Sequence, residues 1–148
     1  MNGKGVKMQI WDTTGSIKYV TETNLKSTDG VLLIYNITDR ESFENLNSWL
    51  TEVKKNAEKG TCILLVGVNS DLEDERKVSY QEGKDFATSN GIKFFEVSAK
   101  NNINVKEAFE ILSEDILNTK VNLKKYDDMN KPFHPVLPRK KDGFCNIY

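Results

Sequence analysis

The chain has 148 residues, enough for one globular domain and little more. Hydrophobic residues make up 38% of it, which supplies a core, and the formal net charge of −1 argues against a protein that binds nucleic acid through bulk electrostatics. Its two cysteines, Cys62 in an apolar run and Cys145 near the end, do not indicate a disulfide framework, so a reducing, cytoplasmic setting fits best.

Four stretches of the chain are predicted to form strands. Residues 6–11 alternate between apolar and polar side chains, the pattern of a half-buried strand. Residues 31–35 and 62–66 are continuously apolar, as in strands that are covered on both faces. Residues 92–97 form a fourth and weaker candidate.

Three helices are predicted between and after these strands. The first begins at a cap, Asp39, carries an apolar stripe and ends at Gly60, and the second runs from a capping box at Ser79 to Gly91. The third follows Asn104, which can cap it, and its stripe is Val105, Ala108, Phe109, Leu112 and Ile116. Strands that alternate with helices predict an α/β protein, with a mainly parallel sheet and helices on both faces.

The helical pattern stops at about Lys120. All three prolines lie beyond it, and a basic run, Arg139-Lys140-Lys141, precedes the last residues. We therefore expect one domain over residues 1–119 and a flexible tail over residues 120–148.

Polar loops follow three of the predicted strands, and in an open parallel sheet ligands bind beyond the carboxyl ends of the strands. Asp12 could hold a magnesium ion through water, and Gly15 has no side chain to keep a phosphate away from its N–H. Asp71 could accept two parallel hydrogen bonds from a guanine edge. Each motif alone is common in loops. Their order after successive strands, with residues 98–100 as the third loop, indicates a nucleotide site.

Several segments resemble Rab-type small GTPases of the Ras superfamily. Residues 7–15, KMQIWDTTG, are similar to the KLQIWDTAG segment of that family, and residues 30–43, GVLLIYNITDRESF, are similar to its next strand and helix start. Residues 65–72 and 96–100, the latter EVSAK, complete the series in the family's order. The resemblance covers about residues 2–119.

The resemblance implies a guanine-nucleotide switch that regulates vesicle traffic, binds GTP or GDP with magnesium, and acts through effectors and regulators; nucleic acid is not an implied partner. Carried over by position, Asp12 would meet magnesium and the Gly15 backbone would sense the γ-phosphate. The base would be read by Asp71, with the remaining nucleotide-binding positions at Asn69, Ser98, Ala99 and Lys100.

The family's phosphate loop, G-x-x-x-x-G-K-[ST], does not occur in the 148 residues. The resemblance therefore implies an incomplete P-loop GTPase fold that begins roughly 50 residues late and lacks the first, central strand and the first helix, so that tight GTP binding is lost. The strands at residues 6–11 and 31–35 would each face an empty place in the sheet. They must pair directly, recruit another chain, or stay as open edges.

Two surviving motifs also depart from the family pattern. Ser16 stands where the family has the glutamine that positions the attacking water, so hydrolysis would be slow even with nucleotide bound. The base-reading N-K-x-D appears as Val68-Asn69-Ser70-Asp71, which keeps the aspartate but changes the asparagine and the lysine. We expect guanine recognition to be weakened and not abolished.

The last four residues, Cys145-Asn146-Ile147-Tyr148, have the C-a-a-X form of a prenylation site, although tyrosine is not a usual last residue. Two interpretations stay open. Either Cys145 is prenylated and anchors the chain to the cytoplasmic face of a membrane, with the basic run adding attraction to anionic lipid, or the tail is an ordinary solvated segment.

Three functions are compatible with these observations. The chain can be a GTPase whose reading frame starts further upstream, a Rab-like module that binds partners regardless of nucleotide, or a truncated product without function. Whether it hydrolyses GTP stays open, because both the phosphate loop and the glutamine are missing from the sequence.

Overall fold

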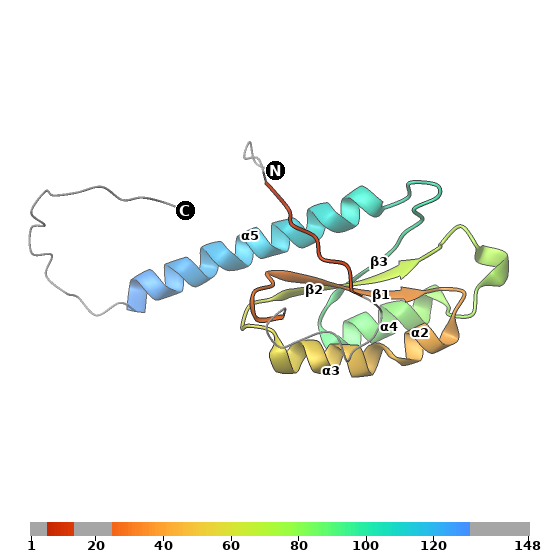
Figure 1. Cartoon of the computed structure of the whole chain (residues 1–148), viewed down its shortest axis with the longest axis horizontal. Helices are drawn as coiled ribbons and strands as arrows, with labels where there is room; N and C mark the ends of the chain where they lie inside the picture. The colour runs from red at the N-terminus through yellow and green to blue at the C-terminus, as the bar shows by residue number, and fades with distance from the viewer. Residues whose placement is uncertain (1–5, 14–24, 131–148) are drawn as a thin grey trace, which may run out of the picture.

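The computed structural model describes residues 6–13 and 25–130, with side chains up to residue 122. Within these residues, three strands form one parallel sheet in the order β1-β2-β3. They are β1 (Gly30–Asn36), β2 (Cys62–Val68) and β3 (Lys93–Glu96). Neighbouring strands are parallel and follow one another in the chain. The chain must therefore return over one face of the sheet between them, and helices form these crossover connections (Figure 1).

The helices cover both faces of this sheet. On one face lie α2 (Arg40–Glu44), α3 (Leu46–Asn56) and α4 (Tyr80–Asn90), and on the other lies the long α5 (Val105–Asn130) (Figure 1). A short 3₁₀ helix, η2 (Glu73–Glu75), lies between β2 and α4. The predicted α/β class, with a parallel sheet between helices, is therefore confirmed.

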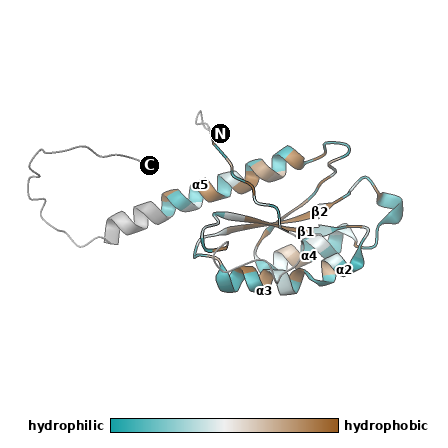
Figure 2. Cartoon of the chain, in the orientation of Figure 1, coloured by the Kyte–Doolittle hydropathy of each residue, from teal (hydrophilic) through white to brown (hydrophobic). Residues whose placement is uncertain are grey.

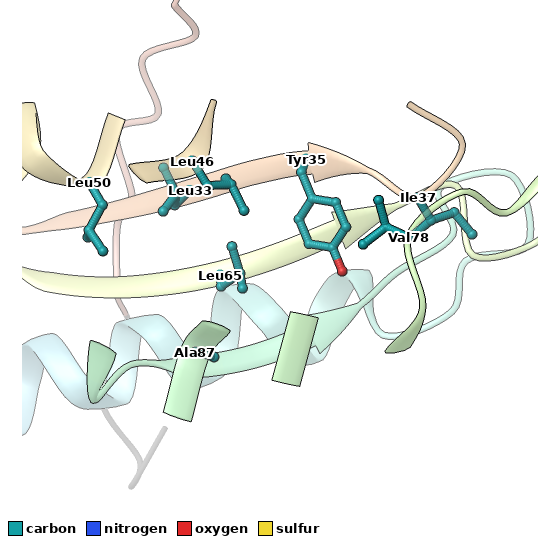
Figure 3. Close-up of a cluster of buried hydrophobic side chains, with 8 residues drawn as sticks. All are labelled: Leu33, Tyr35, Ile37, Leu46, Leu50, Leu65, Val78 and Ala87. Carbon is teal, nitrogen blue, oxygen red and sulfur yellow. The ribbon is translucent and has the colours of Figure 1, made fainter. Parts of the chain in front are cut away.

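Apolar side chains form a core on each face of the sheet. Leu33, Leu65 and the residues around them pack under α2, α3 and α4 (Figure 3). On the other face, Leu64 and Val66 pack against Ala108 and Leu112 of α5. The strands β1 and β2 are apolar along most of their length (Figure 2), which is expected when successive side chains enter two different cores.

Local signals set several helix ends as predicted. Asp39 accepts a hydrogen bond from Glu41 N–H at the start of α2, and Ser79 and Glu82 form the reciprocal capping box at the start of α4. Gly91 ends α4 in the left-handed conformation, with φ 67°, which glycine adopts without the steric cost of a side chain.

The first predicted helix differs from the expected single helix. It divides at Asn45 into α2 and α3, and α3 ends at Asn56 because Ala57 is extended, with ψ 151°. Gly60, predicted to end the helix, instead has φ 98° in the turn before β2. Gly60 therefore adopts a positive φ, as a glycine at a helix end would, but it belongs to the turn and not to the end of the helix.

The third predicted helix begins where expected but ends later. Asn104 precedes α5, and its carbonyl oxygen accepts from Ala108 N–H over 3.0 Å. Its φ is 57°, and its side-chain amide donates to Glu96 O, 2.9 Å away. At the other end α5 continues to Asn130, beyond the predicted end of the helical pattern near Lys120. Residues 120–130 contain neither proline nor glycine, so no helix breaker stops the helix there.

The predicted strand at residues 6–11 is not formed. All six residues lie outside strands and are exposed, including Trp11 at 80% exposure. A period-two pattern provides side chains for two faces, but a strand also needs a neighbour for its backbone, and in the described part of the chain this segment has none. The prediction was wrong because pairing is a nonlocal property.

Candidate functional site

The loops after β2 and β3 meet at the carboxyl edge of the sheet. Hydrogen bonds continue past the ends of the strands: Val97 N–H donates to Gly67 O over 2.8 Å, and Ser70 N–H donates to Val97 O over 3.1 Å. The two loops are therefore held together by backbone. We call residues 69–71 and 98–100 the rim.

Asp71 is the centre of the rim. Its side chain is only 9% exposed, and its Oδ1 accepts a hydrogen bond of 2.5 Å from the hydroxyl of Ser98, which is itself fully buried. Ser98 Oγ also accepts from Asn101 N–H at 3.1 Å, so the hydroxyl proton is directed to the carboxylate. This arrangement fixes the plane of the Asp71 carboxylate through a residue of the neighbouring loop.

The surroundings of Asp71 favour its ionised form. The Ser98 hydrogen bond, with a smaller contribution from Lys100, lowers the pKa of the Asp71 carboxyl below its ordinary value. Lys100 Nζ lies 3.9 Å from Asp71 Oδ2, and the lysine side chain is 77% exposed. A fixed, ionised carboxylate with one oxygen less heavily bonded than the other can accept N–H donors from a ligand.

The backbone of the rim includes conformations that asparagine tolerates well. Asn69 has φ 63°, and Leu72 N–H donates to its carbonyl oxygen at 2.9 Å, which forms a tight turn ahead of η2. In the second loop, Ser98 and Ile103 exchange two backbone hydrogen bonds, of 3.0 and 2.9 Å, that close residues 98–103. Ala99 and Lys100 project from this closed loop and are exposed.

A second ion pair supports the rim, and the sequence analysis missed it. The Arg76 guanidinium binds both carboxylate oxygens of Glu96, at the end of β3, with two distances of 2.8 Å, and it also binds Glu73. The Arg76 and Glu96 side chains are 15% and 11% exposed. Hydrogen bonds to Glu96 and then Glu73 raise the pKa of Arg76, so it stays charged. The pair ties the segment after η2 to β3.

The remaining predicted site residues lie in the segment before α2 or outside the described residues. Asp12 is exposed in the unpaired segment at residues 6–13, and Gly15, Ser16 and Cys145 lie outside the described residues. In the described ranges no three acidic, histidine or cysteine side chains gather as metal ligands. The described residues therefore do not form a magnesium site by themselves.

A cleft lies at the end of the sheet opposite the rim. It is shallow, with a volume of about 380 Å³, and is lined in part by Cys62 and Asp115 at the amino ends of β2 and β3. Within residues 6–13 and 25–130, none of the helices combines the length and apolar character needed to span a bilayer.

Known proteins resemble this chain in sequence along most of its length. The model of the Ras family matches residues 1–118. The chain is 41% identical over 134 residues to the Ras-related protein Rab-13 of Bos taurus, covering 89% of this chain and 66% of that protein. It is 45% identical over 119 residues to the Ras-related protein Rab-2B of Dictyostelium discoideum, covering 79% of this chain and 59% of that protein.

A third relative, the GTP-binding protein ypt2 of Schizosaccharomyces pombe, is 39% identical over 124 residues. The match covers 82% of this chain and 62% of ypt2. The chain thus spans somewhat less than two thirds of the length of these curated relatives.

Proposed function

Because this chain belongs to the Ras family, and within it to the Rab type, we propose that it is a guanine-nucleotide-binding protein of vesicle traffic whose base site is the rim. Ras-family GTPases in general bind GTP or GDP with magnesium. The observation that carries the proposal is the Asp71 carboxylate, held by Ser98 and flanked by Lys100. Effectors and regulators of the Rab type are the proposed partners.

The chemistry of guanine matches this carboxylate. Guanine presents a ring N–H and an amino group side by side, and a carboxylate accepts two such donors in parallel. Adenine presents an acceptor at the corresponding ring position and is therefore disfavoured. Lys100 and Ala99 are exposed next to Asp71, where the lysine stem can cover a flat ring and the Ala99 backbone can contact its edge.

Affinity and hydrolysis are proposed to be weak in a chain made of these 148 residues. The sequence contains no G-x-x-x-x-G-K-[ST] run, and backbone N–H groups and a lysine from such a loop neutralise the β- and γ-phosphates. Without them, the base contributes most of the binding. Ser16 is too short to orient a water molecule as the family glutamine does, so bound GTP would be hydrolysed slowly.

The test is a calorimetric titration of the full 148-residue chain with GDP, ADP and XDP in the presence of magnesium. The wild-type chain should prefer GDP to ADP. Asp71→Asn should reduce GDP affinity at least tenfold and shift the preference toward XDP, because xanthine has a carbonyl where guanine has its amino group and an amide can donate to it.

Asp115→Asn is the matched control for this titration. It makes the same chemical change at an acidic residue of α5 whose partner is Lys93, far along the strands from the rim. It should leave the order of the three nucleotides unchanged. Equal loss of GDP binding in both variants would show that Asp71 does not read the base.

A second function is supported by the replacements at Val68 and Asn69, which stand where the family has base-binding asparagine and lysine. In this alternative the chain is a Rab-like module that binds effectors or regulators without nucleotide. A folded chain that takes up none of the three nucleotides would favour this alternative. Submicromolar GDP affinity would contradict it.

We also propose that Cys145 carries a prenyl group that holds the chain on the cytoplasmic face of a membrane. The C-terminal C-a-a-X form and the nearby Arg139-Lys140-Lys141 support this proposal, since one lipid chain plus basic residues makes a firmer anchor than the lipid alone. Mass spectrometry of the chain from eukaryotic cells should show the added lipid on Cys145. Unmodified Cys145 throughout would contradict the proposal.

A further inference from the structure

The strand β1 is paired along one edge only, within the part of the chain that the structure describes. Ile37 N–H donates to Val68 O, and Asp29 O accepts from Cys62 N–H, so odd-numbered residues of this strand face β2. Because the ladder alternates, the backbone groups of Gly30, Leu32 and Ile34 point to the other edge.

This edge lacks the features that protect natural edge strands. Its sequence, GVLLIYN, has no charged residue and no proline, whereas exposed edges usually carry one or the other. Leu32 packs into the core under α5, and Ile34, on the same face, is 52% exposed. The edge therefore combines unpaired backbone groups with an exposed apolar side chain, which is a template for another strand.

The same chain contains a segment that can fill this template. Residues 6–11 have the period-two pattern of a strand but lie outside the sheet. Their apolar side chains are exposed, at 43% for Val6, 51% for Met8 and 65% for Ile10. The segment touches α5 through a hydrogen bond from Ser113 Oγ to Met8 Sδ, 3.1 Å long, and thioether sulfur is a weak acceptor. This hydrogen bond is weaker than the backbone hydrogen bonds of a strand pair.

We propose that residues 6–11 of one copy pair with the open edge of β1 in a second copy, and that the exchange is reciprocal. A second copy is the occupant that the structure supports, because each chain supplies both a strand-forming segment and an unpaired edge. Exchange about a twofold axis then forms two strand pairs and covers both Ile34 side chains. The segment of the same copy lies against Ser113 of α5.

Two variants separate the donor segment from the acceptor edge. The double substitution Gln9→Pro/Ile10→Pro disables the donor segment. Proline has no backbone N–H, and the N–H groups of successive strand residues point to opposite edges. One of the two removed N–H groups would therefore have faced the partner strand. Ile34→Lys disables the acceptor by placing a charge on its edge. Leu117→Lys is the matched control, since Leu117 is an apolar α5 side chain with 40% exposure.

The measurement is the mass of the full chain by light scattering and native mass spectrometry. Wild type and Leu117→Lys should be dimers, and each disabled variant alone should be a monomer. A mixture of the two disabled variants should form a heterodimer, because an intact donor then meets an intact edge. Far-UV circular dichroism checks that each variant is folded.

The other outcomes each overturn the proposal in a recognisable way. A wild-type chain that is monomeric at all concentrations shows that the edge is not used by a second copy. A donor-disabled variant that still dimerises shows that residues 6–11 are not the segment that pairs. Failure of two folded, disabled variants to combine shows that the exchange is not the mode of association.

Discussion

Tyr35 places a hydroxyl group in an otherwise apolar core. The side chain is 1% exposed, and its ring contacts Phe43 edge-on, with 5.1 Å between ring centroids. The hydroxyl makes no hydrogen bond with any described residue, and burial raises the pKa of Tyr35 above its ordinary value. Figure 3 shows that hydroxyl pointing across the sheet from β1. The ring stabilises the core, whereas the unpaired oxygen opposes that stabilisation.

Tyr35→Phe should therefore keep or raise stability. The ring contacts stay, and the cost of burying an unsatisfied hydroxyl, about 1–3 kcal/mol, is removed in part. The free energy of unfolding from urea titration measures the change. A loss above about 1 kcal/mol would mean that the hydroxyl has a partner in solution.

Gly83→Ala provides a linked comparison at this position. A Cβ on Gly83 would overlap Tyr35 Oη and would lie 2.6 Å from Phe94 Cζ, so overpacking should cost roughly 1–3 kcal/mol. In the Tyr35→Phe background the same substitution should cost less, since one of the two overlaps is gone. Equal costs in both backgrounds would place the strain at Phe94 alone.

The residues of the rim were predictable to different degrees. Asp71 and Ser98 belong to short runs whose order after successive strands indicated a nucleotide site, and the structure joins them at 2.5 Å. Arg76 could not be found this way, because it stands in none of the quoted motifs and its partner, Glu96 of the EVSAK run, is 20 residues away. Pairing of distant charges depends on the fold, which the local pattern does not contain.

At the scale of elements, signals within a few residues were reliable and signals that need a partner were not. The capping box of Ser79 and the left-handed Gly91 bound α4 as predicted, since both act within one turn. Residues 6–11 were misassigned because a strand requires a neighbouring backbone. The end of α5 was missed because no cap or proline marks it before Asn130.

The start of α4 also gives a pH-dependent contribution to stability. The Glu82 carboxylate accepts hydrogen bonds from Arg40 of α2 and from Ser79, its partner in the capping box. These bonds lower the pKa of Glu82 to about 2, and the bond from Arg40 has the largest effect. Because the folded pKa lies below the unfolded value of 4.5, the stabilisation is complete above pH 4.5 and is lost as pH falls toward 2.

Glu82→Gln should remove that dependence. Between about pH 5 and pH 3 the urea midpoint of the wild type should fall further than that of the variant, because only the wild type has this carboxylate to protonate. The difference between the two chains is the readout, since Asp71 and Glu73 also have lowered pKa values. Glu114→Gln, at an exposed position of α5, is the control, and it should follow the wild type.

At the scale of the whole molecule, the three strands of the described residues separate two cores, and the outer edges of β1 and β3 have no strand partner there. The strand β2 contributes to both cores, with Leu65 on one face and Leu64 on the other. Unfolding of β2 would therefore disrupt both cores together. We therefore expect the described body to unfold as one cooperative unit. The open edge of β1 is the place where the stability of this unit can depend on a second chain.

That dependence leads to a prediction about concentration. If folded chains associate through the exchanged segment, unfolding also dissociates them, and each tenfold rise in protein concentration stabilises the dimer by about 1.4 kcal/mol. The urea midpoint of the wild type should rise steadily over a hundredfold range of concentration. Ile34→Lys should show a midpoint independent of concentration, and Leu117→Lys should rise like the wild type. A constant wild-type midpoint would mean that the edge stays unpaired, and an Ile34→Lys midpoint that still rises would place the association on another surface.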